Sequence, residues 1–181
     1  MRTEIETERL LLRLPRPADV ETWSTAVADP EVMQYIGSGE TGDRADAAQS
    51  IERFIERWKA NGFGQYAVER RDDGAFLGRL GLLVWDSRVW RPSTLPEASE
   101  AAEIELGWTL LRDYWGHGYA TEASAAVRDA AWEDLEPKRL ISLIHPDNVR
   151  SIRVAERLGA IPTETIQTGG HGLAVLWVHP R

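Results

Sequence analysis

A glycine-rich loop opens a predicted amphipathic helix, and this junction constrains the fold more than any other feature of the chain. The segment is Tyr114-Trp115-Gly116-His117-Gly118-Tyr119-Ala120-Thr121-Glu122-Ala123. Small residues at Gly116, Gly118 and Ala120 let the backbone approach a bulky anion, and the free N–H groups of the first helical turn point toward it. An apolar face supports the helix, with spacings of three and four between Ala123, Ala126, Val127, Ala130 and Ala131. The pattern is typical of a loop that holds a diphosphate.

A glycine loop before a helix also occurs in dinucleotide-binding folds, in nucleoside-triphosphate-binding folds and in plain tight turns. This loop lacks the Gly-Lys-Ser/Thr of a P-loop, and Thr121 stands where a G-x-G-x-x-G fingerprint needs its last glycine. The sequence therefore favours an anion-binding loop of another class. A tight turn without a ligand stays open as the alternative.

Two predicted strands flank the loop and its helix. Residues 103–111 alternate, with Ile104, Leu106, Trp108 and Leu110 on one face and Glu103, Glu105, Gly107 and Thr109 on the other. Residues 139–144 form a mostly apolar strand after the helix. The order strand, loop, helix, strand predicts a right-handed parallel crossover, and anion-binding loops lie at the carboxyl ends of such strands.

The remaining predicted elements are assigned from periodicity and turn signals. We expect a strand over 7–14, helices over 17–27, 30–35, 43–61 and 148–158, strands over 65–70 and 76–84, and a closing strand over 173–178. The third helix has Asp43 as N-cap and Asn61-Gly62 as terminator, and its core positions are Ile51, Phe54, Ile55 and Trp58.

The segment from Trp85 to Ala102 has two prolines and two tryptophans but no clear period. It is long for a hairpin loop, so it is either a functional flap or a solvated insertion. An exposed Trp85 or Trp90 would mark a dimer surface, or would fold back on the domain. A monomer and a homodimer are both open.

Composition excludes several classes of protein. The 181 residues, 43% of them hydrophobic, predict one domain over residues 1–181, and a formal charge of −8 argues against a nucleic-acid partner. The chain has no cysteine, so disulfides, cysteine nucleophiles and thiolate metal sites are excluded. The spacing of the four histidines predicts no metal site. No apolar run approaches the roughly 20 residues that span a bilayer, and no signal-peptide core is present, so we expect a cytoplasmic protein with no membrane partner.

Several spaced motifs together resemble the GNAT superfamily of acyl-CoA-dependent N-acetyltransferases. They are Glu105-Leu106-Gly107-Trp108, the loop from Trp115 to Ala123, Asn148-Val149-Arg150-Ser151 and Glu156-Arg157-Leu158-Gly159. The stretch from Thr7 to Arg13 is similar to the opening signature of the ribosomal-protein N-terminal (RimJ/RimL-like) branch. The resemblance implies an α/β (α+β) fold with a mixed, mostly antiparallel central sheet, two splayed parallel central strands and flanking helices. Acetyl-CoA, as cosubstrate, would enter between those strands.

The resemblance also implies which residues hold acetyl-CoA. The pyrophosphate would meet backbone amides of Gly116, His117, Gly118, Tyr119 and Ala120 and the hydroxyl of Thr121. Pantetheine would pair with backbone groups of Trp108, Thr109 and Leu110 as an added strand, and Asn148 would reach the same arm. Arg157, Arg112 or Arg153 would meet the phosphates, unless these arginines are only solvated. Trp115 departs from the polar residue usual at the first position of the loop.

Acetyl transfer to an amine requires a general base, because a lysine-like amine has a pKa of about 10 and an N-terminal amine one of about 8. Glu105 is the candidate, and Glu103 on the same strand face is an alternative for the same role. The alternative for either glutamate is a purely structural role in a salt bridge. Ser151, on the helix face of Asn148, is the candidate donor to the leaving thiolate, or else a plain helix serine. The tyrosine that many GNAT members use is absent from residues 154–157.

The leading hypothesis is direct acetyl transfer to a primary amine, either a protein N-terminus or a small-molecule amine. A catalytically idle acyl-CoA-binding sensor or interaction module is the alternative from another class. A dinucleotide-dependent oxidoreductase is disfavoured because the six-residue glycine fingerprint is missing. His171, between glycines, either lines the substrate mouth or stands in a turn.

Overall fold

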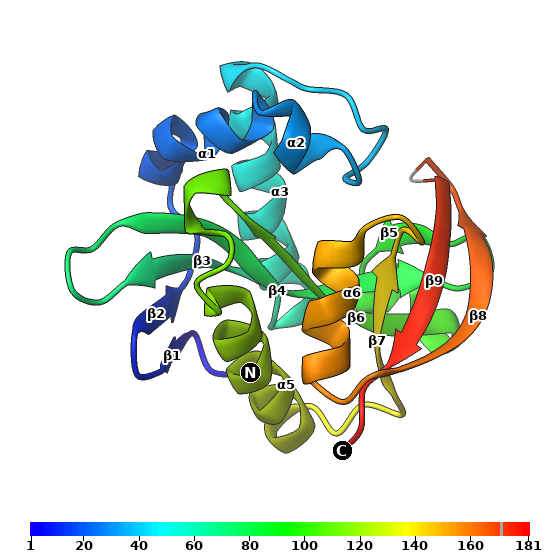
Figure 1. Ribbon diagram of the computed structural model, residues 1–181. Helices are drawn as coiled ribbons and strands as arrows, with labels where there is room; N and C mark the ends of the chain where they lie inside the picture. The colour runs from blue at the N-terminus through cyan, green and yellow to red at the C-terminus, as the bar shows by residue number, and fades with distance from the viewer. Residues whose placement is uncertain (171) are drawn as a thin grey trace.

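A single mixed sheet of nine strands organises the computed structural model, which describes residues 1–170 and 172–181 (Figure 1). The strands are β1 (Glu4–Glu6), β2 (Leu10–Arg13), β3 (Gln65–Arg70), β4 (Phe76–Asp86), β5 (Arg91–Ser93), β6 (Ala102–Leu110), β7 (Leu140–Ile144), β8 (Ile161–Thr168) and β9 (Gly172–Val178). Their order is β1-β2-β3-β4-β6-β7-β9-β8, with β5 paired to β4. Among the described strands β6 and β7 run parallel and the other pairs are antiparallel. This confirms the predicted fold class.

The helices lie in two groups around the sheet (Figure 1). One group is α1 (Val20–Val27), α2 (Pro30–Met33) and α3 (Arg44–Asn61), with α4 (Leu95–Ala98) against α3, and the other is α5 (Tyr119–Asp134) and α6 (Val149–Arg157). The 3-10 turns are Pro17–Asp19, Ser99–Ala101 and Arg112–Tyr114. Asp43 caps α3 through the amides of Ala45 and Asp46, and Gly62 ends it in the left-handed conformation, as predicted. None of the helices in the described residues is long and apolar enough to cross a membrane.

The two faces of β6 have different surroundings, as its alternation predicts. Leu106 and its neighbours of the same parity share a core cluster with the apolar face of α5. The opposite face, which carries Glu105, Gly107 and Thr109, looks into a cavity bounded by α3 and the loop after α2. The crossover therefore places α5 on one side of the sheet and leaves the polar face of β6 open on the other.

The parallel pair β6 and β7 separates after a short contact. Its register consists of Ile104 with Leu140 and Glu105 with Ile141. At the point of separation the Ser142 hydroxyl donates to the Leu106 carbonyl at 2.6 Å. The two strands then diverge, which opens the sheet between β6 and the start of α6.

Several predicted elements differ from the structure. The strand expected over 7–14 is the shorter β2, because residues 7–9 form the turn that joins it to β1 in a hairpin. Ile55 is half-buried rather than core. The segment after β4 contains β5 and α4, so it is neither a bare flap nor a bare insertion. Strand β8 was not predicted at all.

Candidate active site

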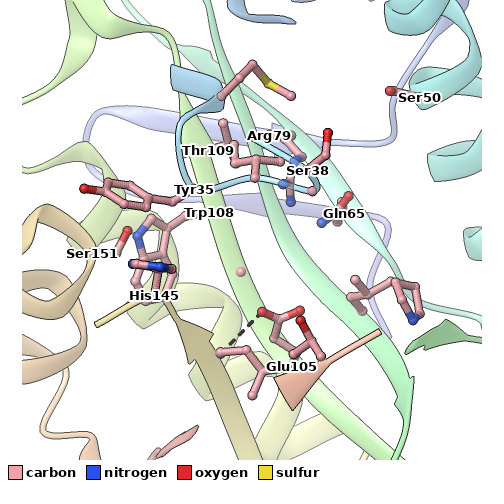
Figure 2. Close-up of a pocket in the computed structure, with 18 of the residues that line it drawn as sticks. Tyr35, Ser38, Ser50, Gln65, Arg79, Glu105, Trp108, Thr109, His145 and Ser151 are labelled. Atoms are coloured by element: carbon pink, nitrogen blue, oxygen red, sulfur yellow. Dashed lines mark hydrogen bonds between the residues drawn. The ribbon is translucent and has the colours of Figure 1, made fainter. Parts of the chain in front are cut away.

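Two cavities meet where β6 and β7 separate. The loop-side cavity, of about 760 Å³, is bounded by the glycine loop, the end of β6 and one face of α6. The α3-side cavity, of about 710 Å³, lies on the opposite face of β6 and contains Glu105 (Figure 2). Both cavities are lined by the same six residues at their junction, which are Tyr35, Ile36, Trp108, Thr109, Asn148 and Ser151. A molecule that crosses the sheet at this point reaches both cavities.

The glycine loop is built to leave the start of α5 open. Gly116 and Gly118 have φ of +81° and +82°, a left-handed conformation that glycine adopts without steric cost. A Cβ at Gly116 would meet nothing within 4 Å. Gly118 is the N-cap of α5 and supplies no side-chain cap, so the first amides of the helix stay available to an anion. The residues from Gly116 to Thr121 all line the loop-side cavity, and they therefore fit the predicted pyrophosphate site.

The N-terminal segment holds this loop from behind. The Thr7 hydroxyl donates to Glu122 at 2.6 Å, and Arg9 donates to the same carboxylate at 2.7 Å and to the His117 carbonyl at 3.0 Å. The Arg9 guanidinium also lies 4.6 Å from the centre of the Tyr119 ring. Burial acts to raise the pKa of Glu122, but the hydrogen bonds from Thr7 and Arg9 outweigh it and lower that pKa. This network gives the Thr7–Arg13 signature a structural reason.

Trp115 fastens the loop to the end of β6. Its indole N–H donates to the Leu110 carbonyl at 2.8 Å, and the Arg150 guanidinium lies 4.4 Å from the centre of the ring. Because the Leu106 and Leu110 carbonyls both point to the side that β7 has left, strand alternation directs the backbone groups of Trp108 to the same open edge. Trp115, which stands in place of the polar residue usual at this position, therefore holds the loop against the end of β6.

Asn148 and Ser151 lie together at the start of α6. Asn148 is the N-cap, and its side-chain oxygen accepts the Ser151 amide at 3.2 Å. The Ser151 hydroxyl makes no hydrogen bond to the described residues, and Figure 2 shows it near Trp108 at the junction. Both side chains are therefore placed where the predicted pantetheine arm and thioester would pass.

The candidate phosphate-binding arginines are divided by the structure. Arg157 and Arg153 line the loop-side cavity. Arg112 points elsewhere, because its guanidinium pairs with Asp29 at 3.1 Å and with Glu31 at 2.9 Å. Arg112 is therefore removed from the candidates.

Glu105 is the carboxylate at the separation of the strands. The indole N–H of Trp85 donates to its Oε2 at 2.6 Å, and the Leu143 amide donates to its Oε1 at 3.4 Å. Burial raises the pKa of Glu105, and the hydrogen bond from Trp85 and the charge of Arg79 oppose the rise only in part. A carboxylate with a raised pKa at a cavity wall is suited to accept a proton.

Glu103, the alternative base, has a different role in the structure. Its two carboxylate oxygens accept from Arg139 at 2.7 and 2.8 Å, in a bidentate ion pair. It lines neither cavity. The salt-bridge interpretation therefore holds for Glu103, whereas Glu105 has no such partner among the described residues.

Sequence reasoning missed four residues of the α3-side cavity, which are Arg57, Gln65, Arg79 and Trp85. Of the two alternatives for Trp85, folding back on the domain holds, since only 4% of its surface is accessible and its indole N–H donates to Glu105. Alternation along β4 places Arg79 on one face with Gly81 and Leu83, but strand order is needed to show that this face looks toward Glu105. His171 lies outside the described residues, and those residues contain no cluster of three His, Cys, Asp or Glu side chains that suits a metal ion.

The sequence matches the family model of the acetyltransferase (GNAT) domain over residues 9–161. YkkB of Bacillus subtilis (strain 168), an uncharacterized protein, is 28% identical over 176 residues, which are 96% of this chain and 94% of YkkB. YnaD, an uncharacterized N-acetyltransferase of the same organism, is 24% identical over 155 residues, or 86% of this chain and 81% of YnaD.

Solved structures agree with this assignment. An acetyltransferase from Agrobacterium tumefaciens str. C58 is 27% identical with a TM-score of 0.79, covering 100% of this chain and 96% of that one. A Vibrio cholerae protein provisionally named a ribosomal-protein-serine acetyltransferase has a TM-score of 0.76 at 22% identity, covering 99% of this chain and 100% of its own. The aminoglycoside acetyltransferase AAC(6')-Ib, solved with coenzyme A, has a TM-score of 0.72 at 18% identity, covering 95% of each chain. The chain therefore belongs to the GNAT family of acetyltransferases, and it is an acetyl-CoA-dependent acyltransferase.

Proposed function

We propose that this enzyme moves the acetyl group of acetyl-CoA directly to a primary amine, with Glu105 as the general base. The observation that supports it is the meeting of two cavities at the separation of β6 and β7. One cavity has an open helix N-terminus suited to a diphosphate, and the other has a carboxylate with a raised pKa. Donor and acceptor would thus approach from opposite faces of the sheet.

In this proposal the loop-side cavity binds the cosubstrate. The amides from Gly116 to Ala120 and the Thr121 hydroxyl hold the pyrophosphate, and Arg157 adds positive charge at its margin. Backbone groups from Trp108 to Leu110 and the side chain of Asn148 hold the pantetheine arm. Acetyl-CoA, when bound, supplies an activated acetyl thioester.

The α3-side cavity prepares the amine. Glu105 takes the proton that the amine must lose, and its raised pKa brings its proton affinity closer to that of the amine. The Ser151 hydroxyl, which makes no hydrogen bond to the described residues, is available to donate toward sulfur. A thiol pKa of about 8.5 makes such a donor useful at neutral pH. With no cysteine in the chain, transfer proceeds without an enzyme thioester.

Two structural neighbours are named for different acceptors. One name refers to ribosomal-protein serine and the other to an aminoglycoside. We therefore keep both a protein N-terminus and a small-molecule amine within the proposal. We place no nucleic acid and no metal in the reaction.

The Glu105→Gln variant tests the assignment of the base. Loss of the base lowers kcat/KM by about 100-fold or more, while the Kd for CoA stays unchanged because Glu105 lies in the other cavity. Thiol release is measured with a panel of small amines and of short peptides with N-terminal Ser, Ala and Met.

Glu103→Gln is the matched control, two residues away on the same strand face. It should retain turnover because Glu103 is paired with Arg139 outside both cavities. Wild-type turnover in Glu105→Gln would remove Glu105 as the base. CoA binding without acetylation of any amine would count against acetyl transfer itself.

A further inference from the structure

Two arginines in the α3-side cavity have no hydrogen-bonding or ion-pairing partner among the described residues. Arg79 extends from β4 and Arg57 from α3, and both are half-buried in the cavity wall. Neither guanidinium has a hydrogen bond or an ion pair to any residue in the described parts of the chain. Arg79 has one ring contact, with its guanidinium 5.7 Å from the centre of the Phe54 ring.

Burying these two guanidinium groups without a hydrogen-bonding partner is energetically unfavourable unless a ligand pairs with them. A guanidinium stays charged at physiological pH, and withdrawing it from water without a partner is unfavourable. Burial lowers the pKa of Arg79 to about 10, with Glu105 opposing and Arg57 adding to the effect. Burial also lowers the pKa of Arg57, and repulsion from Arg53 adds to it. Glu105 attracts both cations without forming an ion pair with either.

Two neutral polar side chains in the same wall are also unsatisfied. Gln65 and Thr109 are 3% and 6% exposed, and within residues 1–170 and 172–181 the Gln65 Oε1 and Thr109 Oγ1 atoms have no hydrogen-bond partner. Thr109 stands directly opposite Arg79 in the β4–β6 register. Buried polar atoms are nearly always paired, so these atoms indicate a polar ligand at this wall. The Gln65 amide can turn its N–H₂ toward an oxygen of such a ligand.

A pair of opposed glycines separates these groups from Glu105 along strands β4 and β6. Glu105 stands opposite Leu83, Arg79 stands opposite Thr109, and between these two pairs Gly81 stands opposite Gly107. The pairs are four residues apart, which is about 13 Å along a strand. Gly107 lines the cavity without a side chain, whereas backbone atoms of Gly64 and Gln65 occupy the space beside Gly81. Figure 2 shows Arg79, Gln65 and Glu105 lining this one cavity.

Apart from Glu105, the acidic residues of the cavity do not neutralise the arginines. Glu40 and Asp46 are exposed at its rim. Glu40 accepts from the Ser38 hydroxyl at 3.3 Å, and Asp46 accepts the Asp43 amide at 2.8 Å as part of the cap of α3. The inner wall is therefore cationic, although the whole chain carries a formal charge of −8.

We infer that the acceptor is a small molecule that carries an anionic oxygen group as well as its amine. Arg79, Arg57 and Gln65 bind the anion, and the amine reaches Glu105 past Gly107. The group is a carboxylate, as in an amino acid, or a phosphonate or phosphate of similar chemistry. This inference rests on the proposed acetyl transfer and narrows its acceptor. A polycationic amine would be repelled by the same wall.

The test compares matched acceptors. The common L-amino acids, with β-alanine and γ-aminobutyrate to vary the distance from amine to carboxylate, are assayed by CoA release against their carboxamides. Aminomethylphosphonate against glycine separates the two anion sources. We expect carboxylates or the phosphonate to exceed their neutral counterparts in kcat/KM by about 10- to 100-fold, the range of a charged hydrogen-bonded contact.

Arg79→Gln should remove this preference by raising KM for the anionic acceptor by about tenfold, with kcat largely kept. Arg57→Gln is a second variant with the same expected direction. Arg44→Gln is the control, because Arg44 lies on the same helix as Arg57 but pairs with Glu21 at the surface. Thermal unfolding of each variant separates loss of binding from loss of the fold.

Equal use of carboxylates and carboxamides by the wild type, or an unchanged preference in Arg79→Gln, would overturn the inference. If no amine is acetylated, calorimetric titration of the CoA-loaded protein with the same L-amino acids tests the anion site directly. Binding of carboxylates that is lost in Arg79→Gln supports the anion site while counting against acetyl transfer. Absence of any carboxylate binding overturns the anion site.

Discussion

At Glu105, neighbouring groups shift the pKa of one carboxylate in opposite directions. Burial raises its pKa, whereas the Trp85 indole N–H, the charge of Arg79 and the Leu143 amide lower it. A hydrogen bond accepted by the ionised carboxylate stabilises that form, so each donor extends the pH range in which the base is deprotonated. The pH at which Glu105 becomes deprotonated is therefore set by neighbouring residues that take no part in the reaction.

The Trp85→Phe variant measures the contribution of the indole. It removes the N–H that donates at 2.6 Å and keeps an aromatic ring, so the pKa of Glu105 rises further. The acidic limb of the pH profile of kcat/KM should move to higher pH by about one unit, since a hydrogen bond of about 1.4 kcal/mol corresponds to one pKa unit. Trp132→Phe is the control, because its indole donates to the Pro180 carbonyl away from both cavities. A limb that stays in place, or that moves to lower pH, would contradict the role of Trp85.

The site residues could be predicted to different degrees. Alternation over residues 103–111 placed Glu105 on the correct face, and the pair at Asn148 and Ser151 lies where the motifs indicated. Trp85 could not be placed, because the predicted strand ended at residue 84, whereas β4 runs to Asp86. Those two residues decide whether Trp85 is a loop residue or a partner of Glu105. Arg79 needed the pairing of β4 with β6, which is not a local property of the sequence.

Among the elements, the loop before α5 depends on two left-handed glycines and on the absence of a side-chain cap. Each feature alone is common in turns. Together with the support from Thr7 and Arg9, they hold an open helix N-terminus rigidly beside a cavity. We therefore expect a substitution in this loop to change the affinity for the cosubstrate independently of its effect on the stability of the fold.

Gly116→Ala and Gly74→Ala form a matched pair for that expectation. Their φ values are +81° and +70°, and a Cβ at either position meets nothing within 4 Å. Both variants should lose about 1 to 2 kcal/mol of unfolding free energy from the left-handed conformation. Gly116→Ala should in addition raise the Kd for CoA by about tenfold, because its methyl group enters the cavity wall. Equal Kd values for CoA in the two variants would show that the loop does not bind the cosubstrate.

Helices were easier to predict than strands, for a physical reason. The caps of α3 and α6 at Asp43 and Asn148 are local, and so is the 3.6-residue period. Strand β8 was missed because its first five residues are exposed, it contains Pro162, and its place depends on pairing with β9. An edge strand of this kind has no apolar alternation to mark it.

For the whole molecule, the end of the chain joins three strands at the point where the sheet opens. The His179 amide donates to the Leu140 carbonyl at 2.9 Å, and its ring Nε2 lies 2.8 Å from the Ser142 hydroxyl, which in turn donates to the Leu106 carbonyl. Since the Ser142 proton is used toward Leu106, the ring nitrogen facing it is the N–H donor. His179 is 2% exposed, and burial, with repulsion from Arg128, lowers its pKa to about 4.

This histidine makes the stability of the fold depend on pH. In the unfolded chain it takes up a proton below its ordinary pKa of 6.5, whereas in the folded protein it stays neutral down to about 4. The unfolded state therefore binds more protons in this window, so stability is full above pH 6.5 and falls as the pH drops toward 4. The shift corresponds to a loss of up to about 3 kcal/mol.

Urea unfolding of wild type and His179→Gln at pH 7, 5.5 and 4.5 measures this loss of stability. The variant retains an amide N–H for Ser142 but does not titrate, so its stability should decline less steeply than that of the wild type. Parallel declines in the two proteins would show that groups other than His179 control acid unfolding.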